Sequence, residues 1–143
     1  MAHEDKGHYA DKHPDQKTDP VIAAKLQSVT KENQLSCASA HKAAAELGVA
    51  PKEVGIQADL LELRIVKCQL GLFGYEPEQK RIDPEIDVSD DLWATIENQS
   101  TDGKISCRES WDIAKDFKIS RLHMGSACEK INIRVKPCQL GAF

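Results

Sequence analysis

The sequence VKCQLGLF occupies residues 66–73 and returns, with three substitutions, as KPCQLGAF at residues 136–143. An offset of 70 residues extends this match without a gap, so that residues 19–73 align with residues 89–143. Self-similarity at one fixed offset is the signature of a repeated structural unit. The chain is therefore predicted to contain two copies of one unit. Eleven of the 55 aligned positions are identical, namely Ala24, Ser36, Cys37, Ala44, Gly55, Arg64, Cys68, Gln69, Leu70, Gly71 and Phe73 in the first copy.

The composition bounds the size of the cores and the class of protein. The 143 residues are 41% hydrophobic and 29% charged, which suffices for one ordinary core or two small ones. No apolar run approaches the roughly 18 residues of a membrane span, and no apolar signal region precedes the copies. We therefore expect a soluble, cytoplasmic protein without membrane contact. Five cysteines favour reduced thiols here, and a net charge of -4 does not indicate nucleic acid as a basic domain would.

Two polar segments frame the copies. Residues 1–18 have no apolar period and are predicted to form a disordered tail. Residues 75–88 contain two prolines and no core pattern, so they are predicted to be a linker. The first repeat is then placed at residues 19–74 and the second at residues 89–143.

Each copy is predicted to fold as helix, short strand, helix, turn, helix and strand. Asp19 and Ser89 are typical N-caps of a first helix. Ser106 forms a capping box for the second helix of its copy, and Pro51 lies early in the third helix of the other. Alternating strands rich in Ile and Val follow, at residues 63–68 and 133–138.

The second and third helices resemble a helix-turn-helix motif. Ala44 allows the two helices to cross closely, Gly48 allows the tight turn, and Val54 faces the core. Lys118 takes the place of the turn glycine in the second copy, where a left-handed backbone costs about 1 kcal/mol. The order of elements is similar to that of winged-helix domains, and the CQLG-x-F endings are similar to those of a family of uncharacterised prokaryotic proteins. The resemblance implies a mainly α fold with short β, in which two tandem winged-helix-like repeats, each a helix-turn-helix plus a small two-stranded sheet, form a pseudo-two-fold arrangement.

The repeated octet is predicted to complete the core of its own repeat. It follows the last strand, Gly71 allows the chain to turn, and Leu70 and Phe73 can fill the base of the core. Cys68 is then expected near Cys37, since a buried free cysteine behaves as a small hydrophobe.

A metal- or thiol-linked sensor is the minor alternative. No pair of cysteines has the close C-x2-C spacing of a zinc site. The cysteines that begin the second helices lie where a helix dipole activates thiols, but no histidine base accompanies both. No phosphate-binding loop, G-x-S-x-G motif or paired carboxylate indicates an enzyme, so we expect no catalytic residue, metal or cofactor. The soft ligands weighed for metal are Cys37, His41 and Cys68 in the first copy, and Cys107, Cys128 and Cys138 in the second.

The outward face of the third helix distinguishes DNA from protein as the partner, because a recognition helix presents donors to bases and phosphates. In the first copy this face carries Ile56 and Leu60, which form a candidate protein interface. The same face of the second copy is more polar and basic. The candidate DNA-binding residues are Arg121, His123, Ser126 and Lys130, together with Lys52 and Gln57 of the first copy.

The leading interpretation is a regulatory DNA-binding protein of the tandem helix-turn-helix type. The alternative is a protein–protein interaction module that keeps a winged-helix scaffold without DNA binding. The expected partners are accordingly DNA, a second copy in a homodimer, or another protein. Ile56 and Leu60 are expected to be covered by the other repeat, by the segment after Phe73 or by another chain.

Overall fold

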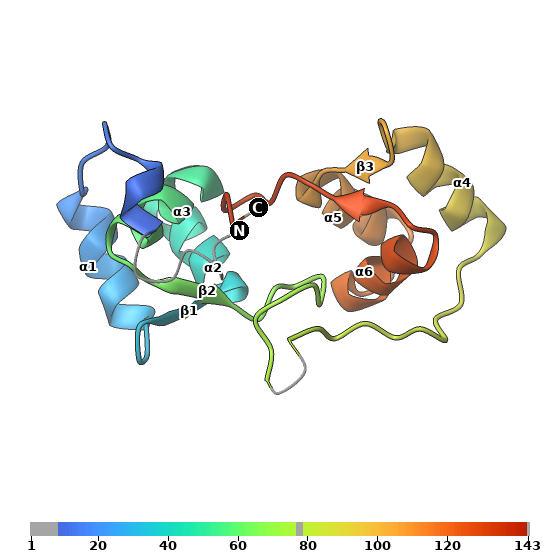
Figure 1. Cartoon of the computed structure of the whole chain (residues 1–143), viewed down its shortest axis with the longest axis horizontal. Coiled ribbons are helices and arrows are strands. Elements are labelled where there is room, and N and C mark those ends of the chain that lie inside the picture. The colour runs from blue at the N-terminus through green and yellow to red at the C-terminus, as the bar shows by residue number, and fades with distance from the viewer. Residues whose placement is uncertain (1–8, 77–78, 143) are drawn as a thin grey trace. The chain divides into compact units, whose positions relative to one another are not determined.

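A computed structural model describes residues 9–76 and 79–142 of the chain, so that residues 1–8 of the predicted tail and two residues of the predicted linker lie outside the described residues. The fold is mainly helical with two small sheets, which confirms the predicted class. The chain divides into two compact units (Figure 1). Unit 1 comprises Met1–Lys67 together with Gln139–Phe143, and unit 2 comprises Cys68–Cys138.

Unit 1 begins with a short 3-10 helix that precedes three α-helices and two strands (Figure 1). As predicted, the side chain of Asp19 caps the first α-helix by accepting hydrogen bonds from the backbone N–H groups of Val21 and Ile22. Gly48 ends the second α-helix in the left-handed conformation, with a φ of 69°. The elements are η1 (Tyr9–Lys12), α1 (Pro20–Val29), β1 (Gln34–Ser36), α2 (Cys37–Leu47), α3 (Pro51–Leu60) and β2 (Arg64–Val66).

Unit 2 repeats this order from its own N-caps. Ser89, Ser106 and Ser120 each accept a hydrogen bond from a backbone N–H in the first turn of the helix that follows, and Glu109 completes the predicted capping box with Ser106. Lys118 adopts the left-handed backbone that the predicted turn requires, with a φ of 55°. The elements are α4 (Asp90–Gln99), β3 (Lys104–Ile105), α5 (Cys107–Asp116), α6 (Arg121–Lys130) and β4 (Arg134–Val135).

The strands of each unit form one parallel pair. Leu35 is in register with Ile65 in unit 1, and Ile105 with Val135 in unit 2. Parallel strands need a long crossover, which two helices supply in each unit. The strand pairs are shorter than the predicted strands, and they are not the antiparallel hairpin that gives a wing.

Each unit has a core at the junction of its helices and strand pair. The apolar periodicity predicted an inward stripe in the third helix of each unit, and Val54, Ala58, Met124 and Cys128 are buried as predicted. Leu61 and Ile131, which end the two predicted stripes, are only half-buried. Leu26 and Ile96 are fully buried on the first helix of each unit. The buried residues of the strand pairs and second helices are Leu35, Cys37, Ala40, Ala43, Ala44, Ile65, Val66, Ile105, Cys107, Ser110, Ile113, Ala114 and Val135.

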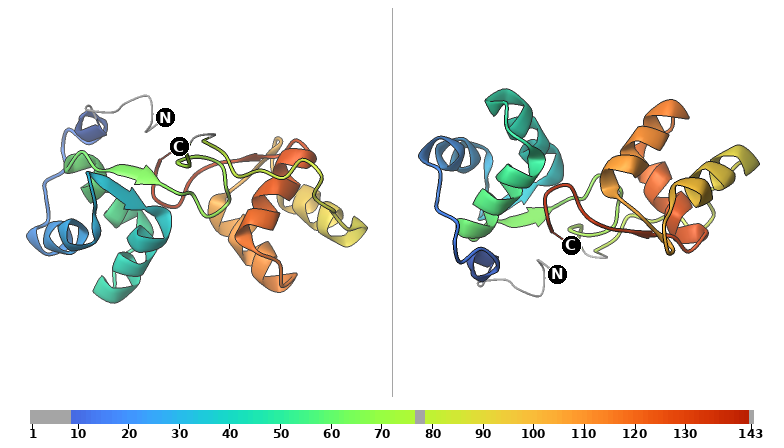
Figure 2. Two further views of the ribbon diagram at one scale, coloured as in Figure 1. Left: turned by 90° about the horizontal axis from the view of Figure 1, so that it is seen from below. Right: turned by 90° about the horizontal axis from the view of Figure 1, so that it is seen from above.

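The described part of the predicted tail corrects that prediction. Tyr9 is only 1% exposed, and η1 packs against α3 (Figure 2). A turn at Pro14 and Asp15 then leads into α1, and the backbone N–H of Gln16 donates to the carbonyl of His13 over 3.2 Å. The polar composition was misleading because acidic side chains at the end of α3 and just beyond it bind this segment, as described below.

The predicted linker belongs to unit 2 and repeats the same turn. Pro84 is equivalent to Pro14 at the offset of 70 residues. The backbone N–H of Ile86 donates to the carbonyl of Asp83 over 3.3 Å, as that of Gln16 does to His13. We call residues 9–19 the first leading segment and residues 79–89 the second leading segment. The repeated architecture therefore begins before α1 and α4, not at the residues that cap them.

The repeated octets correct the prediction most strongly, because neither completes the core of its own repeat. The segment Gln139–Phe143 of the second repeat belongs to unit 1, and the octet of the first repeat belongs to unit 2 from Cys68 onward. Cys68 therefore lies in unit 2 together with Cys138, whereas Cys37 lies in unit 1. The two repeats have thus exchanged the ends of their octets, from Cys68 onward in the first and from Gln139 onward in the second.

Candidate functional site

The exchanged segments lie against one glycine in each unit. A Cβ atom added to Gly55 of α3 would lie 1.7 Å from the carbonyl oxygen of Leu140, and a Cβ atom added to Gly125 of α6 would lie 1.7 Å from the carbonyl oxygen of Leu70. Neither glycine has a positive φ, so glycine is required for space and not for conformation. We call these two contacts, each with the segment it holds, the Gly55 site and the Gly125 site.

Buried apolar side chains anchor both segments. Leu70 is 0% exposed and Leu140 is 3% exposed. Phe73 is buried beside the first and Ala142 beside the second. The octet of the Gly125 site closes on itself, because the backbone N–H of Cys68 donates to the carbonyl of Phe73 over 3.1 Å. Each segment is therefore a compact turn whose leucine fills the unit that receives it.

Polar contacts add to the Gly125 site. Arg121 donates to the side-chain carbonyl of Gln69 over 2.8 Å, and its guanidinium lies 3.7 Å from the centroid of the Trp111 ring. The hydroxyl of Tyr75 donates to the carbonyl of Cys68 over 2.7 Å, and the backbone N–H of Arg81 donates to the carbonyl of Gly71 over 2.7 Å. Arg121, the first candidate for a phosphate contact, thus binds the octet.

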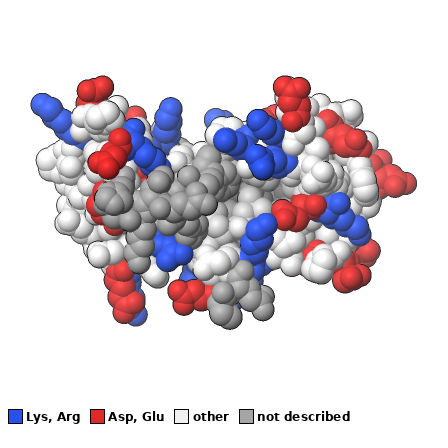
Figure 3. All heavy atoms as spheres, in the orientation of Figure 1, with Lys and Arg blue, Asp and Glu red and all other residues white. Residues whose placement is uncertain are grey.

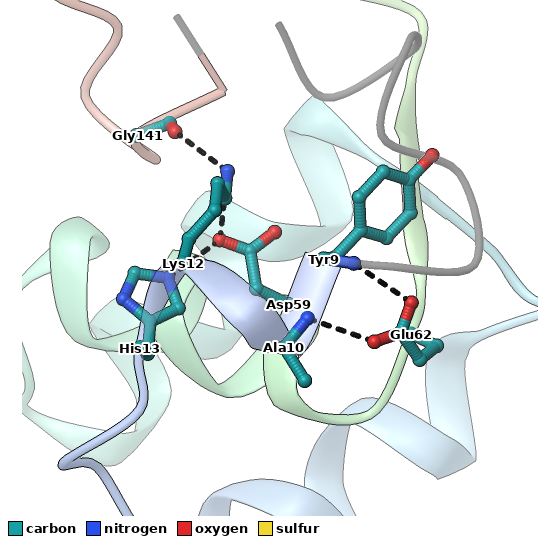
Figure 4. Close-up of polar contacts among 7 residues, drawn as sticks. All are labelled: Tyr9, Ala10, Lys12, His13, Asp59, Glu62 and Gly141. Atoms are coloured by element: carbon teal, nitrogen blue, oxygen red, sulfur yellow. Dashed lines mark hydrogen bonds and ion pairs between the residues drawn. The ribbon is translucent and has the colours of Figure 1, made fainter.

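In unit 1 the first leading segment binds α3 and the residues that follow it through charged side chains (Figure 4). The carboxylate of Glu62 accepts hydrogen bonds from the backbone N–H groups of Tyr9 and Ala10, over 2.9 and 2.8 Å. Asp59 lies 2.8 Å from Nε2 of His13 and 3.0 Å from Nζ of Lys12. Lys12 also reaches the Gly55 site, where it donates to the carbonyl of Gly141 over 3.4 Å.

Gln57 of α3 also binds the first leading segment. It is 4% exposed, and its side-chain amide accepts from the backbone N–H of Asp19 and donates to the carbonyl of Lys17. The prediction that Gln57 is available to DNA is therefore wrong: a buried polar side chain needs partners, and the backbone of the leading segment supplies them.

In unit 2 the second leading segment lies along α6 and contacts three of the candidate DNA-binding residues. Ser126 is 2% exposed and accepts a hydrogen bond from the backbone N–H of Asp83, so its predicted exposure is also wrong. His123 contacts the carbonyl of Asp87 over 3.1 Å, and Lys130 donates to the carbonyl of Ile86 over 2.7 Å. The second leading segment thus binds the face that was predicted to meet DNA.

The other candidate residues of α3 are less covered. Lys52 is exposed, whereas Ile56 and Leu60 are half-buried. Asp59 and Glu129 occupy equivalent positions, and each pairs with a lysine of its leading segment, so both leading segments run past equivalent positions of the third helix. The shared Pro14 and Pro84 were the sequence signal that could have revealed these segments.

A pocket of about 440 Å³ lies between the second leading segment and the beginning of α6. Its lining mixes apolar and basic side chains, and Leu122 beside it is 42% exposed. The lining residues are Lys80, Arg81, Ile82, Asp83, Ile86, Ser120, Leu122, His123 and Ser126.

The cysteines are free thiols, and all except half-buried Cys138 are buried. Burial raises the pKa of the Cys128 thiol to about 12, and the nearby carboxylate of Glu129 adds to the rise. Burial also raises the pKa of Cys68. A raised pKa disfavours the reactive thiolate at both positions. Within the described residues no three His, Cys, Asp or Glu side chains gather as a metal site would require.

Comparisons with protein-family models, with curated proteins and with solved structures found no match. Among the helices of the described residues, none combines the length and the apolar character that are needed to cross a bilayer.

Proposed function

We propose that the protein is a protein–protein interaction module that holds a turn-forming CQLG-x-F segment against the glycine of its third helix. The observation that carries this proposal is the pair of glycine sites, each of which holds a segment contributed by the other repeat. Such a site has the parts of a peptide-recognition site: a floor without a side chain, and a buried leucine that fills a pocket in the core. Burial of one leucine contributes about 1.5 to 3 kcal/mol, which is the scale of a weak peptide anchor.

A helix-turn-helix-like scaffold in each repeat is part of the proposal. The left-handed turns at Gly48 and Lys118, between helices that pack on one another, support it. A full winged helix has less support, because the strand pairs are parallel. The pseudo-two-fold arrangement of the repeats stays a prediction.

DNA binding is the second candidate function. Arg121, Lys130 and Lys52 are exposed cations on third helices, which is the observation that favours it. Arg121 and Lys130, however, already donate to acceptors within unit 2. Acidic and basic side chains are also interspersed on the face drawn in Figure 3, where a phosphate backbone would prefer a continuous basic surface.

A peptide titration tests the proposed function. The full chain with Leu140→Asp should release its own segment from the Gly55 site, because a charged side chain cannot enter the core. A labelled peptide of residues 136–143 should then bind this variant, as followed by fluorescence anisotropy under reducing conditions. The same peptide with Leu140→Ala should bind at least about tenfold more weakly.

Two controls decide the outcome. Adding Gly55→Ala to the Leu140→Asp chain should abolish peptide binding, because the new Cβ atom would occupy the place of the peptide carbonyl. Equal binding with and without Gly55→Ala, or no binding at all, would contradict the proposal. A parallel titration with mixed-sequence duplex DNA should show no steep loss of affinity between about 50 and 200 mM salt, whereas a steep loss would support the DNA candidate.

A further inference from the structure

We infer that the Gly55 site accepts the segment Gln139–Phe143 of a second copy of this chain, so that two chains associate by exchanging this segment. The inference rests on the proposed function, because it names the partner of the same site. Two chains can make between them the same exchange that the two repeats make within one chain.

The Gly55 site already receives its segment from another repeat. The segment leaves unit 2 after Cys138, and its Leu140 and Ala142 are buried in unit 1, at 3% and 5% exposed. The contacts that hold it are non-covalent. A second chain presents the same leucine, the same carbonyl oxygen and the same turn, so every contact can be remade between chains. Exchange of an identical element between protomers is a low-cost route to a dimer.

The residues that lead to the segment are exposed, and the segment carries its own turn. Lys136 and Pro137, which lead from β4 to the segment, are exposed. Gly141 takes a φ of 76° and makes the turn within the segment itself, so the turn moves with the segment to whichever chain receives it. The conformation that the Gly55 site reads is therefore local and does not depend on which chain supplies it.

The two glycine sites differ in the polar contacts that hold their segments. The octet of the Gly125 site is held further by Arg121, Tyr75 and Arg81, and the second leading segment follows it directly. Pro51 occupies the position of Arg121 in the first copy, so the third helix supplies no guanidinium there, and Lys12 of the first leading segment donates to the carbonyl of Gly141 over 3.4 Å. Exchange between chains is therefore assigned to the Gly55 site and not to the Gly125 site.

Within one chain the segment competes at an effective concentration in the millimolar range, so the exchanged dimer of the natural chain forms at high protein concentration. Two complementary full-length variants remove this competition. The chain with Gly55→Ala keeps a competent segment but has a blocked site. The chain with Leu140→Asp keeps an open site but has an incompetent segment.

Each variant alone should remain monomeric, and their equimolar mixture should form a heterodimer, measured by native mass spectrometry and light scattering. The affinity in the mixture should lie within about tenfold of that of the free octet peptide for the Leu140→Asp chain. The double variant Gly55→Ala/Leu140→Asp, which has neither an open site nor a competent segment, is the matched control and should associate with neither single variant.

The outcomes separate the two proposals. If the peptide binds the Leu140→Asp chain while the mixture stays monomeric at the same concentrations, the inference is overturned and the proposed function stands. If the peptide does not bind either, both fail. Should a variant not fold, the natural chain refolded together with an isotope-labelled copy provides a second measurement. Mixed-mass dimers that increase with concentration are expected, and their absence at every concentration would also overturn the inference.

Discussion

Units 1 and 2 are built from the same repeat, yet they hold their leading segments by different chemistry. In unit 1 carboxylates at the end of α3 and beyond it, Asp59 and Glu62, bind the segment through ion pairs and backbone N–H groups. In unit 2 Ser126, His123 and Lys130 of α6 bind the backbone of the segment, and Glu129, at the position of Asp59, adds only an exposed ion pair with Lys80. The comparison teaches that a leading segment binds the third helix in both units, although buried or half-buried carboxylates hold it in one unit and contacts to its backbone hold it in the other.

The largest expected effect comes from placing a methyl group in the glycine sites. Gly125→Ala should lower the free energy of unfolding by about 3 to 5 kcal/mol, because the octet must leave and expose Leu70 and Phe73. Gly55→Ala should cost less, about 2 to 3 kcal/mol, because the released segment buries Leu140 and Ala142, whose apolar surface is smaller than that of Leu70 and Phe73. Urea unfolding checks both values.

The two tryptophans make this comparison specific to one unit. Trp93 and Trp111 both lie in unit 2, so tryptophan fluorescence follows that unit, whereas far-UV circular dichroism follows both. Gly125→Ala should shift the fluorescence transition and Gly55→Ala should not. Gly48→Ala is the matched control, since its Cβ atom would meet nothing within 4 Å and should cost only the left-handed strain of about 1 kcal/mol. Equal tolerance of all three changes would contradict the glycine sites.

The next effect compares the chemistry of the two leading segments. Asp59→Ala should cost about 2 to 4 kcal/mol, because the side chain is 7% exposed and leaves His13 and Lys12 without their carboxylate. Ser126→Ala should cost about 1 kcal/mol, since it removes one neutral hydrogen bond. Chemical denaturation of the two variants measures the difference. The reverse order would show that the charged contacts of unit 1 add little.

Alkaline pH should weaken unit 2 through Cys128, whose counterpart in unit 1 is Ala58. The folded thiol has a pKa of about 12 against an ordinary value of 9.0, so it stays protonated while the unfolded thiol ionises. The stabilising contribution is therefore complete below pH 9 and is lost as the pH rises toward 12. By pH 10 the loss should reach about 1.4 kcal/mol. Fluorescence-detected unfolding of Cys128→Ala should lack this loss relative to the natural chain.

The smallest effect is expected at the ion pair between Lys80 and Glu129. Both side chains are about half exposed, at 54% and 45%, so water screens the pair. Lys80→Ala should change the free energy of unfolding by no more than about 0.5 kcal/mol. A thermal shift larger than that of Ser126→Ala would mean that this end of the second leading segment matters more than its contact with Ser126.

The helices were predictable because their signals are local. N-caps at Asp19, Ser89 and Ser106 and the turn at Gly48 each act within a few residues. The apolar periodicity also placed Val54 and Met124 in the cores. None of these signals depends on which unit the chain enters next.

The exchange of octets could not be predicted from the sequence, because the two octets are nearly identical. Leu70 fits the core of either repeat, and Gly55 and Gly125 offer the same space, so the sequence is symmetric with respect to the exchange. The sequence did not predict the burial of Gln57 and Ser126, for a related reason. A polar residue on a helix is expected to face water unless a partner is known, and here the partner is the backbone of a segment without an apolar period.

Nuclear Overhauser effects between glycine and leucine backbone protons test the exchange of octets most directly. In a chain with selectively labelled glycine and leucine, we predict cross-peaks between the Hα protons of Gly55 and Leu140, and between those of Gly125 and Leu70. These pairs must be close, because each leucine carbonyl oxygen lies 1.7 Å from the place of the missing Cβ atom. Cross-peaks that join Gly55 to Leu70 and Gly125 to Leu140 would contradict the account, since each octet would then complete its own repeat.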